Sequence, residues 1–169
     1  MNSPKMASML AELEQEEAAT LRMLERVPAD KLEWRPHPKS MTLGQLALHT
    51  AGTIGDISNF LELEGFDVND ADFEAAQPAS IDEILEKFET AQAMARERFA
   101  ALSDDQAAAP WTLSKGDTEI FTIPKAWLAR SLMMNHLYHH RGQLSVYLRL
   151  LDVPVPVTYG RSADEDAFA

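Results

Sequence analysis

Apolar residues recur every three or four positions along four stretches of the chain, the spacing of amphipathic helices. The predicted helices cover about residues 4–27, 42–63, 80–102 and 124–151. Two of them begin with capping-box patterns, the T-x-x-Q of Thr42 and Gln45 and the S-x-x-E of Ser80 and Glu83. Pro124 suits the first turn of the last helix. Four helices of this length with little strand predict an all-α fold, a four-helix bundle.

The connections between these helices are long in two places. Residues 65–79 form an acidic loop, and residues 103–123 lack helical periodicity. These lengths allow non-adjacent helices to be joined, so a simple up-down order is not required. Within the second connection, residues 111–113 and 119–121 flank a polar turn in the manner of a short β-hairpin before the last helix. Two strands alone are only marginally stable. The length of 169 residues fits one domain spanning residues 1–169.

Composition limits the chemistry that the chain can carry. It contains no cysteine, which excludes disulfides, thiolate metal sites and cysteine nucleophiles. Any metal must therefore be bound by His, Asp or Glu. The formal net charge of −12 repels phosphate backbones, so we expect no nucleic-acid partner. The acidic residues of the first helix are expected largely on a solvated face: Glu12, Glu14, Glu16 and Glu17.

The N-terminal residues do not resemble a signal peptide, because no apolar run follows them. No stretch approaches the roughly 20 apolar residues that a membrane span needs. We therefore expect a cytoplasmic protein with no membrane partner.

Three histidines are the candidate metal ligands. His136 and His140 are four residues apart on the last helix, so their side chains lie on nearly the same face. Two imidazoles placed in this way can both reach one ion at about 2.0–2.1 Å. The third ligand must come from another helix, and His49 lies on the inward stripe of the second helix, between Leu46 and Thr53. Three buried histidines could satisfy one another by sharing a cation.

Other assignments stay open. His139 competes with His140 as the partner of His136, although the apolar stripe favours His140. His37, between two prolines, is expected at the surface or against Trp34. The histidines could also be hydrogen-bonded packing residues that hold no metal.

Two polar residues are candidates for supporting the ligands or the chemistry. Glu17 interrupts the inward stripe of the first helix, and a small rotation of that helix would place it in solvent instead. Gln143 follows His140 by about one turn and is either a hydrogen-bond partner of the ligands or a polar end of the core.

Two motifs resemble those of a known family. The run from Asn135 to Arg149, NHLYHHRGQLSVYLR, resembles the C-terminal motif of the DinB-like (damage-inducible, YfiT-related) superfamily. The run from Ser40 to His49, with the Trp34-Arg35-Pro36 loop before it, resembles the family's other motif. The resemblance covers essentially the whole chain in helix order and spacing. It implies a four-helix bundle with a long crossover and one divalent metal, commonly zinc or nickel, on His49, His136 and His140. It also implies that a homodimer is frequent.

The resemblance and the three-histidine site lead to two functional hypotheses. The first is a metal-dependent enzyme, because three neutral ligands leave a coordination position open to water or substrate. Some members of this family are S-transferases that use low-molecular-weight thiols such as bacillithiol or mycothiol, which makes a thiol-dependent S-transferase the leading expectation, and a metal-dependent hydrolase is the alternative. The second hypothesis is a non-catalytic stress-response binding module with a structural metal.

Overall fold

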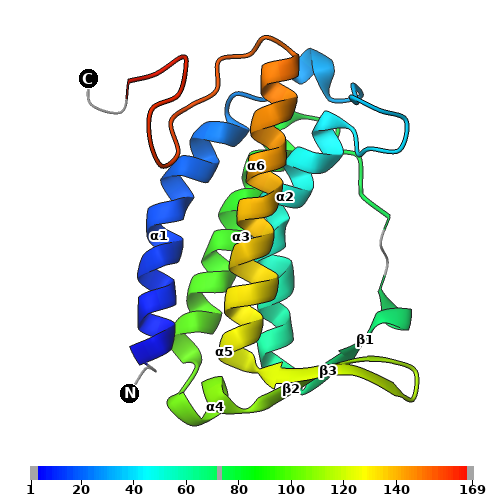
Figure 1. Ribbon diagram of the computed structural model, residues 1–169, viewed down its shortest axis with the longest axis vertical. Coiled ribbons are helices and arrows are strands. Elements are labelled where there is room, and N and C mark those ends of the chain that lie inside the picture. The colour runs from blue at the N-terminus through cyan, green and yellow to red at the C-terminus, as the bar shows by residue number, and fades with distance from the viewer. Residues whose placement is uncertain (1–3, 72–73, 167–169) are drawn as a thin grey trace.

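Four long helices lie side by side in the computed structural model, which describes residues 4–71 and 74–166 (Figure 1). They are α1 (Pro4–Leu24), α2 (Leu43–Ser58), α3 (Ile81–Ala101) and α6 (Asn135–Leu150). The shorter helical elements are α4 (Asp104–Ala108), α5 (Lys125–Leu128), the 3₁₀ turns η1 (Ala29–Lys31), η2 (Asn59–Glu62) and η3 (Val68–Asp70), and the π-helical segment η4 (Ala129–Met134). The first three predicted helices are thus confirmed, with ends that differ by a few residues, whereas the predicted helix over residues 124–151 is divided into several segments.

The chain folds into α2 and α3 where the capping signals predict. Thr42 and Gln45 form the complete capping box: the N–H of Gln45 donates to Thr42 Oγ1 at 3.1 Å, and the N–H of Thr42 donates to Gln45 Oε1 at 2.9 Å. Only one of the two hydrogen bonds predicted for the second capping box is present. Ser80 Oγ accepts from the N–H of Glu83, but the Glu83 carboxylate accepts from the N–H of Ala79 instead of Ser80.

The connection from α2 to α3 is a long crossover, because both helices run in the same direction (Figure 1). The two helices approach closely at Gly55. A Cβ atom there would lie 2.6 Å from Cα and 2.8 Å from Cβ of Ala91, so only glycine fits this approach. The crossover returns the chain from one end of the helices to the other, and it carries a strand that the sequence analysis did not predict.

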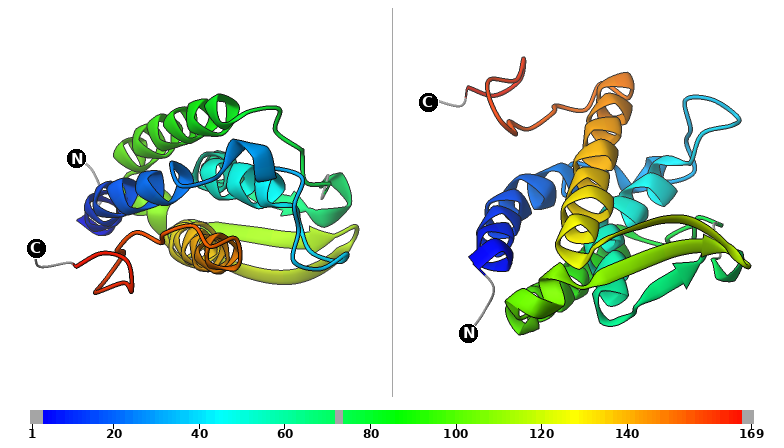
Figure 2. Two further views of the ribbon diagram at one scale, coloured as in Figure 1. Left: turned by 90° about the horizontal axis from the view of Figure 1, so that it is seen from above. Right: turned by 60° about the horizontal axis from the view of Figure 1, so that its bottom comes forward.

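A three-stranded sheet crosses one end of the helices (Figure 2). Its strands β1 (Gly65–Asp67), β2 (Pro110–Lys115) and β3 (Thr118–Pro124) lie in the order β1-β2-β3, with β1 parallel to β2 and β2 antiparallel to β3. The predicted hairpin is therefore confirmed. The all-α prediction needs correction, because β1 comes from the stretch expected to be a loop and supplies the third strand that a stable sheet needs.

The last helix is not the uninterrupted α-helix that its periodicity predicts. Between α5 and α6 lies a π-helical segment, η4 (Ala129–Met134), in which the N–H of Asn135 reaches back five residues to the carbonyl of Arg130. A wide turn of this kind takes one extra residue, and it rotates the residues before it by about 100° relative to those after it. Met133, Met134 and Leu137 are fully buried around this change of register.

Glu16 corrects the expectation that the acidic residues of α1 are largely solvated. Glu14 is exposed and Glu12 and Glu17 are half-buried, whereas Glu16 is buried at 9% exposure. Glu16 is buried because its carboxylate pairs with the buried Arg141 of α6 at 2.6 Å.

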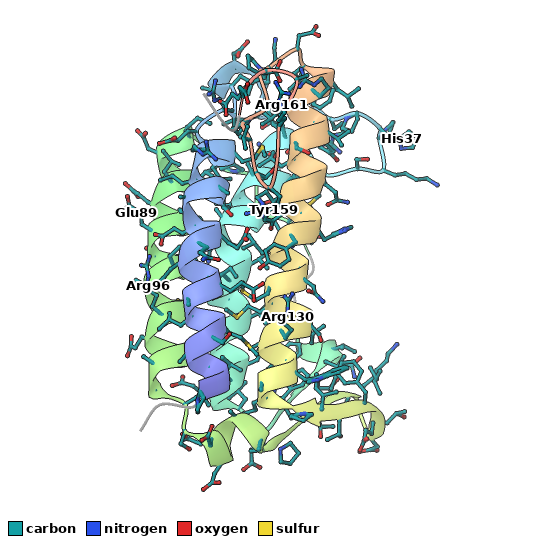
Figure 3. All side chains as sticks on the ribbon, turned by 60° about the vertical axis from the view of Figure 1, so that its left-hand side comes forward. His37, Glu89, Arg96, Arg130, Tyr159 and Arg161 are labelled. Carbon is teal, nitrogen blue, oxygen red and sulfur yellow. The ribbon has the colours of Figure 1, made fainter. Side chains whose placement is uncertain are left out.

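The C-terminal segment runs back along α1 and α6. Arg22 donates to the carbonyl of Val157 at 2.6 Å, and Arg149 pairs with Asp164. Tyr159 lies beside the helices (Figure 3). Within the described residues, no helix combines the length and the apolar character needed to cross a bilayer.

Candidate metal centre

His49, His136 and His140 meet between α2 and α6. His49 comes from the middle of α2, and the other two come from successive turns of α6. Nε2 of His49 lies 3.2 Å from Nε2 of His136 and 3.1 Å from Nε2 of His140. Among the described histidine, cysteine and acidic residues, these three form the group whose ligand atoms could hold a metal, all within 4.8 Å of one another.

The spacing of these nitrogens fits a shared metal ion. Ligand bonds of about 2.0–2.1 Å at tetrahedral angles place neighbouring nitrogens about 3.3 Å apart. The two observed separations are close to that value. A neutral imidazole carries one N–H, so Nε2 of His49 can donate at most one hydrogen bond and cannot satisfy both neighbours by donation. A cation would satisfy all three lone pairs together, and imidazole ligands suit divalent transition metals such as zinc, copper, iron and nickel.

The histidines are held in the neutral form that a metal needs. Burial lowers the pKa of His49, and the Asp56 carboxylate offsets part of this change. Burial also lowers the pKa of His136, with further contributions from His49 and His139, while a hydrogen bond to the backbone of Leu132 raises it. The pKa of His140 falls to about 4, first because of burial and then because of the neighbouring His49. Metal binding near neutral pH therefore has no proton to displace from His140.

Gln143 orients His140. Its Oε1 lies 2.8 Å from Nδ1 of His140, and an amide oxygen can only accept, so Nδ1 carries the ring proton. The lone pair on Nε2 is then directed at the other two histidines. This is the arrangement in which an outer hydrogen bond sets the tautomer of a metal ligand.

A cleft of about 510 Å³ opens beside His49. Charged side chains from α2, α3 and the crossover line it: Asp56, Glu74, Glu83 and Lys87. Asp56 pairs with Lys87 at 2.7 Å. A larger cleft of about 1000 Å³, lined by Trp127 and Arg130 among others, contains none of the three histidines.

The remaining candidates fall outside the histidine cluster. His139 is exposed, and its ring centroid lies 4.8 Å from that of His140, whereas His140 is buried and belongs to the cluster. His37 is at the surface as expected, on a loop away from the helices (Figure 3). The carboxylate of Glu17 forms an ion pair with Arg96 of α3.

The sequence analysis missed a second polar cluster, which follows His140 directly. Arg141 is 3% exposed and donates to Glu16, to Thr20 at 3.0 Å and to the hydroxyl of Tyr159. The hydroxyl of Tyr159 in turn donates to Glu16 at 2.7 Å. Glu16 and Thr20 are four residues apart, so a polar stripe on α1 was the signal that could have revealed this cluster. Asp56 was also missed, although it lies two helical turns after His49.

Comparisons with known proteins agree with this architecture. The DinB family profile matches residues 1–167. The chain is 28% identical over 150 residues to the uncharacterised protein YrdA of Bacillus subtilis strain 168, a match that covers 87% of this chain and 83% of that protein.

Two crystal structures of DinB-like proteins share the fold. One is from Bacillus cereus ATCC 10987, with a TM-score of 0.68 and 23% identity over 89% of this chain and 95% of that one. The other is YjoA of Bacillus subtilis, with a TM-score of 0.68 and 16% identity over 90% and 96%. Because the family profile spans nearly the whole sequence, the chain belongs to the DinB family.

Proposed function

We propose that this protein binds one divalent ion, zinc or nickel, through His49, His136 and His140 and acts as a thiol-dependent S-transferase on a small molecule. The observation that carries the proposal is the convergence of three neutral imidazole nitrogens at 3.1 and 3.2 Å beside a cleft lined by His49. Three protein ligands leave a position for an exogenous group, the arrangement of catalytic rather than structural zinc sites.

The histidines, Gln143 and the residues of the cleft would have different roles. The three histidines would hold the ion, and Gln143 keeps the lone pair of His140 directed at it. When bound, the ion would lower the pKa of a coordinated thiol or water and act as a Lewis acid. The cleft beside His49 would receive the second substrate, with Lys87 and the carboxylates on its wall as polar contacts. We further propose that the protein is cytoplasmic. We also propose that it forms a homodimer, and light scattering tests this oligomeric state.

A metal-dependent hydrolase is the second candidate, and Asp56 favours it. This carboxylate lines the cleft together with His49 and influences the pKa of its ring. A carboxylate near a metal site can accept a proton from water in hydrolysis. A structural metal in a stress-response module would use the same three histidines and give no turnover.

The first experiment is metal analysis of untagged protein by plasma mass spectrometry, with His136→Ala and His139→Ala purified in the same way. Near-stoichiometric zinc or nickel, lost in His136→Ala and retained in His139→Ala, supports the site. Absence of metal from all three after zinc or nickel reconstitution would contradict it. Metal-dependent consumption of a thiol and an electrophile then separates the transferase from ester or amide hydrolysis, and bound metal without either activity indicates the structural role.

A further inference from the structure

A third cleft, which none of the three histidines lines, lies where η2, the last turn of α3, α4 and the start of α5 meet. It encloses about 270 Å³ and is lined by Leu61, Glu62, Arg98, Leu102, Gln106 and Lys125, among others. Two cationic side chains therefore face one small cleft in a protein whose formal net charge is −12.

Lys125 is a buried cation. It is 9% exposed, and its Nζ donates to the carbonyl of Leu61 at 2.8 Å. An ammonium group has three donors, and within residues 4–71 and 74–166 no carboxylate forms an ion pair with this one. Lysine is almost never fully buried unless it is paired, because an uncompensated charge is costly to remove from water.

Arg98 is the second cation that lines the cleft. Its Nη2 lies 3.0 Å from the Glu62 carboxylate, and its Nη1 lies 3.9 Å from Glu97. Its Nε is buried and has no hydrogen-bond partner in the described part of the chain. Glu97 is 75% exposed and does not line the cleft. Among the lining residues, Lys125 and Arg98 are cations and Glu62 is the anion, so the lining carries one positive charge in excess.

Gln106 and the apolar wall complete the cleft. Oε1 of Gln106 accepts from the N–H of Ser103, which leaves the amide NH₂ as a further donor. Leu61 and Leu102 are buried and apolar. A site with excess donors, one net positive charge and apolar walls is complementary to a small anion with acceptor oxygens.

We propose that this cleft binds a small oxyanion, either a carboxylate or a phosphate, between Lys125 and Arg98. The anion supplies a counter-charge for Lys125, and the guanidinium group of Arg98 lies on the same cleft wall. The site is separate from the three histidines, so it stands whether or not those residues carry a catalytic metal.

The test is a titration of the full chain with inorganic phosphate and, separately, with acetate, followed by amide chemical shifts in NMR at constant ionic strength in sodium chloride. We expect saturable shifts confined to Glu62, Leu102, Gln106, Lys125 and their neighbours. Saturation by acetate alone assigns the site to carboxylates, and saturation by phosphate assigns it to phosphate groups.

Variants decide whether these two cations form the site. Lys125→Met and Arg98→Gln are each expected to weaken anion binding by about tenfold or more, since each removes a charge-assisted contact. Lys31→Met removes an exposed lysine that pairs with Asp30 and should leave binding unchanged. If Lys125→Met fails to fold, Arg98→Gln carries the test, because its side chain is 24% exposed. Shifts that do not saturate, or that weaken equally in Lys31→Met, would overturn the proposal.

Discussion

Gln143 fixes the ring proton of His140, because its Oε1 lies 2.8 Å from Nδ1 of that ring and can only accept a hydrogen bond. One residue outside the histidine cluster thus determines which nitrogen of His140 offers its lone pair. The contact is local, spanning one turn of α6, so the same helix supplies two ligands and the group that orients one of them.

Replacing Gln143 with leucine should weaken metal binding by about 10- to 100-fold, the usual effect of removing an outer hydrogen bond from a metal ligand. Competition with a chromogenic chelator measures the affinity. Gln15→Leu, at an exposed position of α1, is the matched control and should bind metal like the parent. Equal affinities in all three proteins would show that the Gln143 contact does not orient the ligand.

The buried pair of Arg141 and Glu16 predicts a large stability change. Arg141→Met leaves the Glu16 carboxylate buried without its cation, and we expect a loss of about 3–5 kcal/mol in the free energy of unfolding. Denaturant unfolding in the presence of chelator measures this loss without a contribution from metal.

Removing both charges supplies the control for that measurement. In Arg141→Met/Glu16→Leu no buried charge is left unpaired, and most of the lost stability should return. Arg26→Met, which breaks an ion pair whose arginine side chain is 42% exposed, should cost less than about 1 kcal/mol. A double variant as unstable as Arg141→Met would contradict the explanation.

Replacing each of two glycines with alanine should change the free energy of unfolding in opposite directions. Gly55→Ala forces a methyl group against the backbone of Ala91, and we expect it to lower the free energy of unfolding by about 1–3 kcal/mol. Gly142, on α6, has open space where a Cβ would lie, so Gly142→Ala should raise it by about 0.5–1 kcal/mol. Thermal unfolding of the two variants beside the parent tests the pair, and a stabilised Gly55→Ala would refute the close approach of α2 and α3.

The tyrosines should titrate differently in the folded and unfolded protein. Burial, with a hydrogen bond to Glu16, raises the pKa of Tyr159 to about 12, and burial, with a hydrogen bond to Glu12, raises the pKa of Tyr138. A raised phenol pKa means that the folded state retains its proton longer. The resulting stability is fully present below pH 10 and is lost as the pH rises through about 12.

Ultraviolet absorbance of phenolate measures this titration. At pH 11 the folded protein should show less phenolate than the same protein in denaturant, and Tyr159→Phe should narrow the difference. Identical titration curves for folded and unfolded protein would count against the hydrogen bonds of both hydroxyls with the carboxylates of α1.

Local signals in the sequence were sufficient to predict the long helices and the histidine cluster. Apolar spacing and the capping box at Thr42 depend on neighbours in sequence, and the four-residue spacing of His136 and His140 is a property of one helix. His49 could be included because the apolar stripe of α2 showed which face is buried.

Features that depend on distant contacts could not be predicted in the same way. The strand β1 has three residues, and it exists because it pairs with β2, more than 40 residues later. The π-helical segment adds a single residue to one turn, and the apolar periodicity of the last helix did not reveal it. Glu16 was assigned to solvent because its partner, Arg141, lies 125 residues away, and the polar stripe that Glu16 forms with Thr20 does not identify that partner.

His49 and His136 are 87 residues apart. An ion shared by their rings would close a loop that contains α3, the whole sheet and α4, none of which supplies a ligand. Those elements could then open only as a closed loop whose two ends stay joined at the ion. The chain has no cysteine, so the shared ion would be a crosslink comparable to a disulfide. Closing a loop of this length costs the unfolded chain roughly 4–5 kcal/mol of conformational entropy. Loss of the ion should therefore increase the opening of the sheet and α3, which lie far along the chain from the histidines themselves.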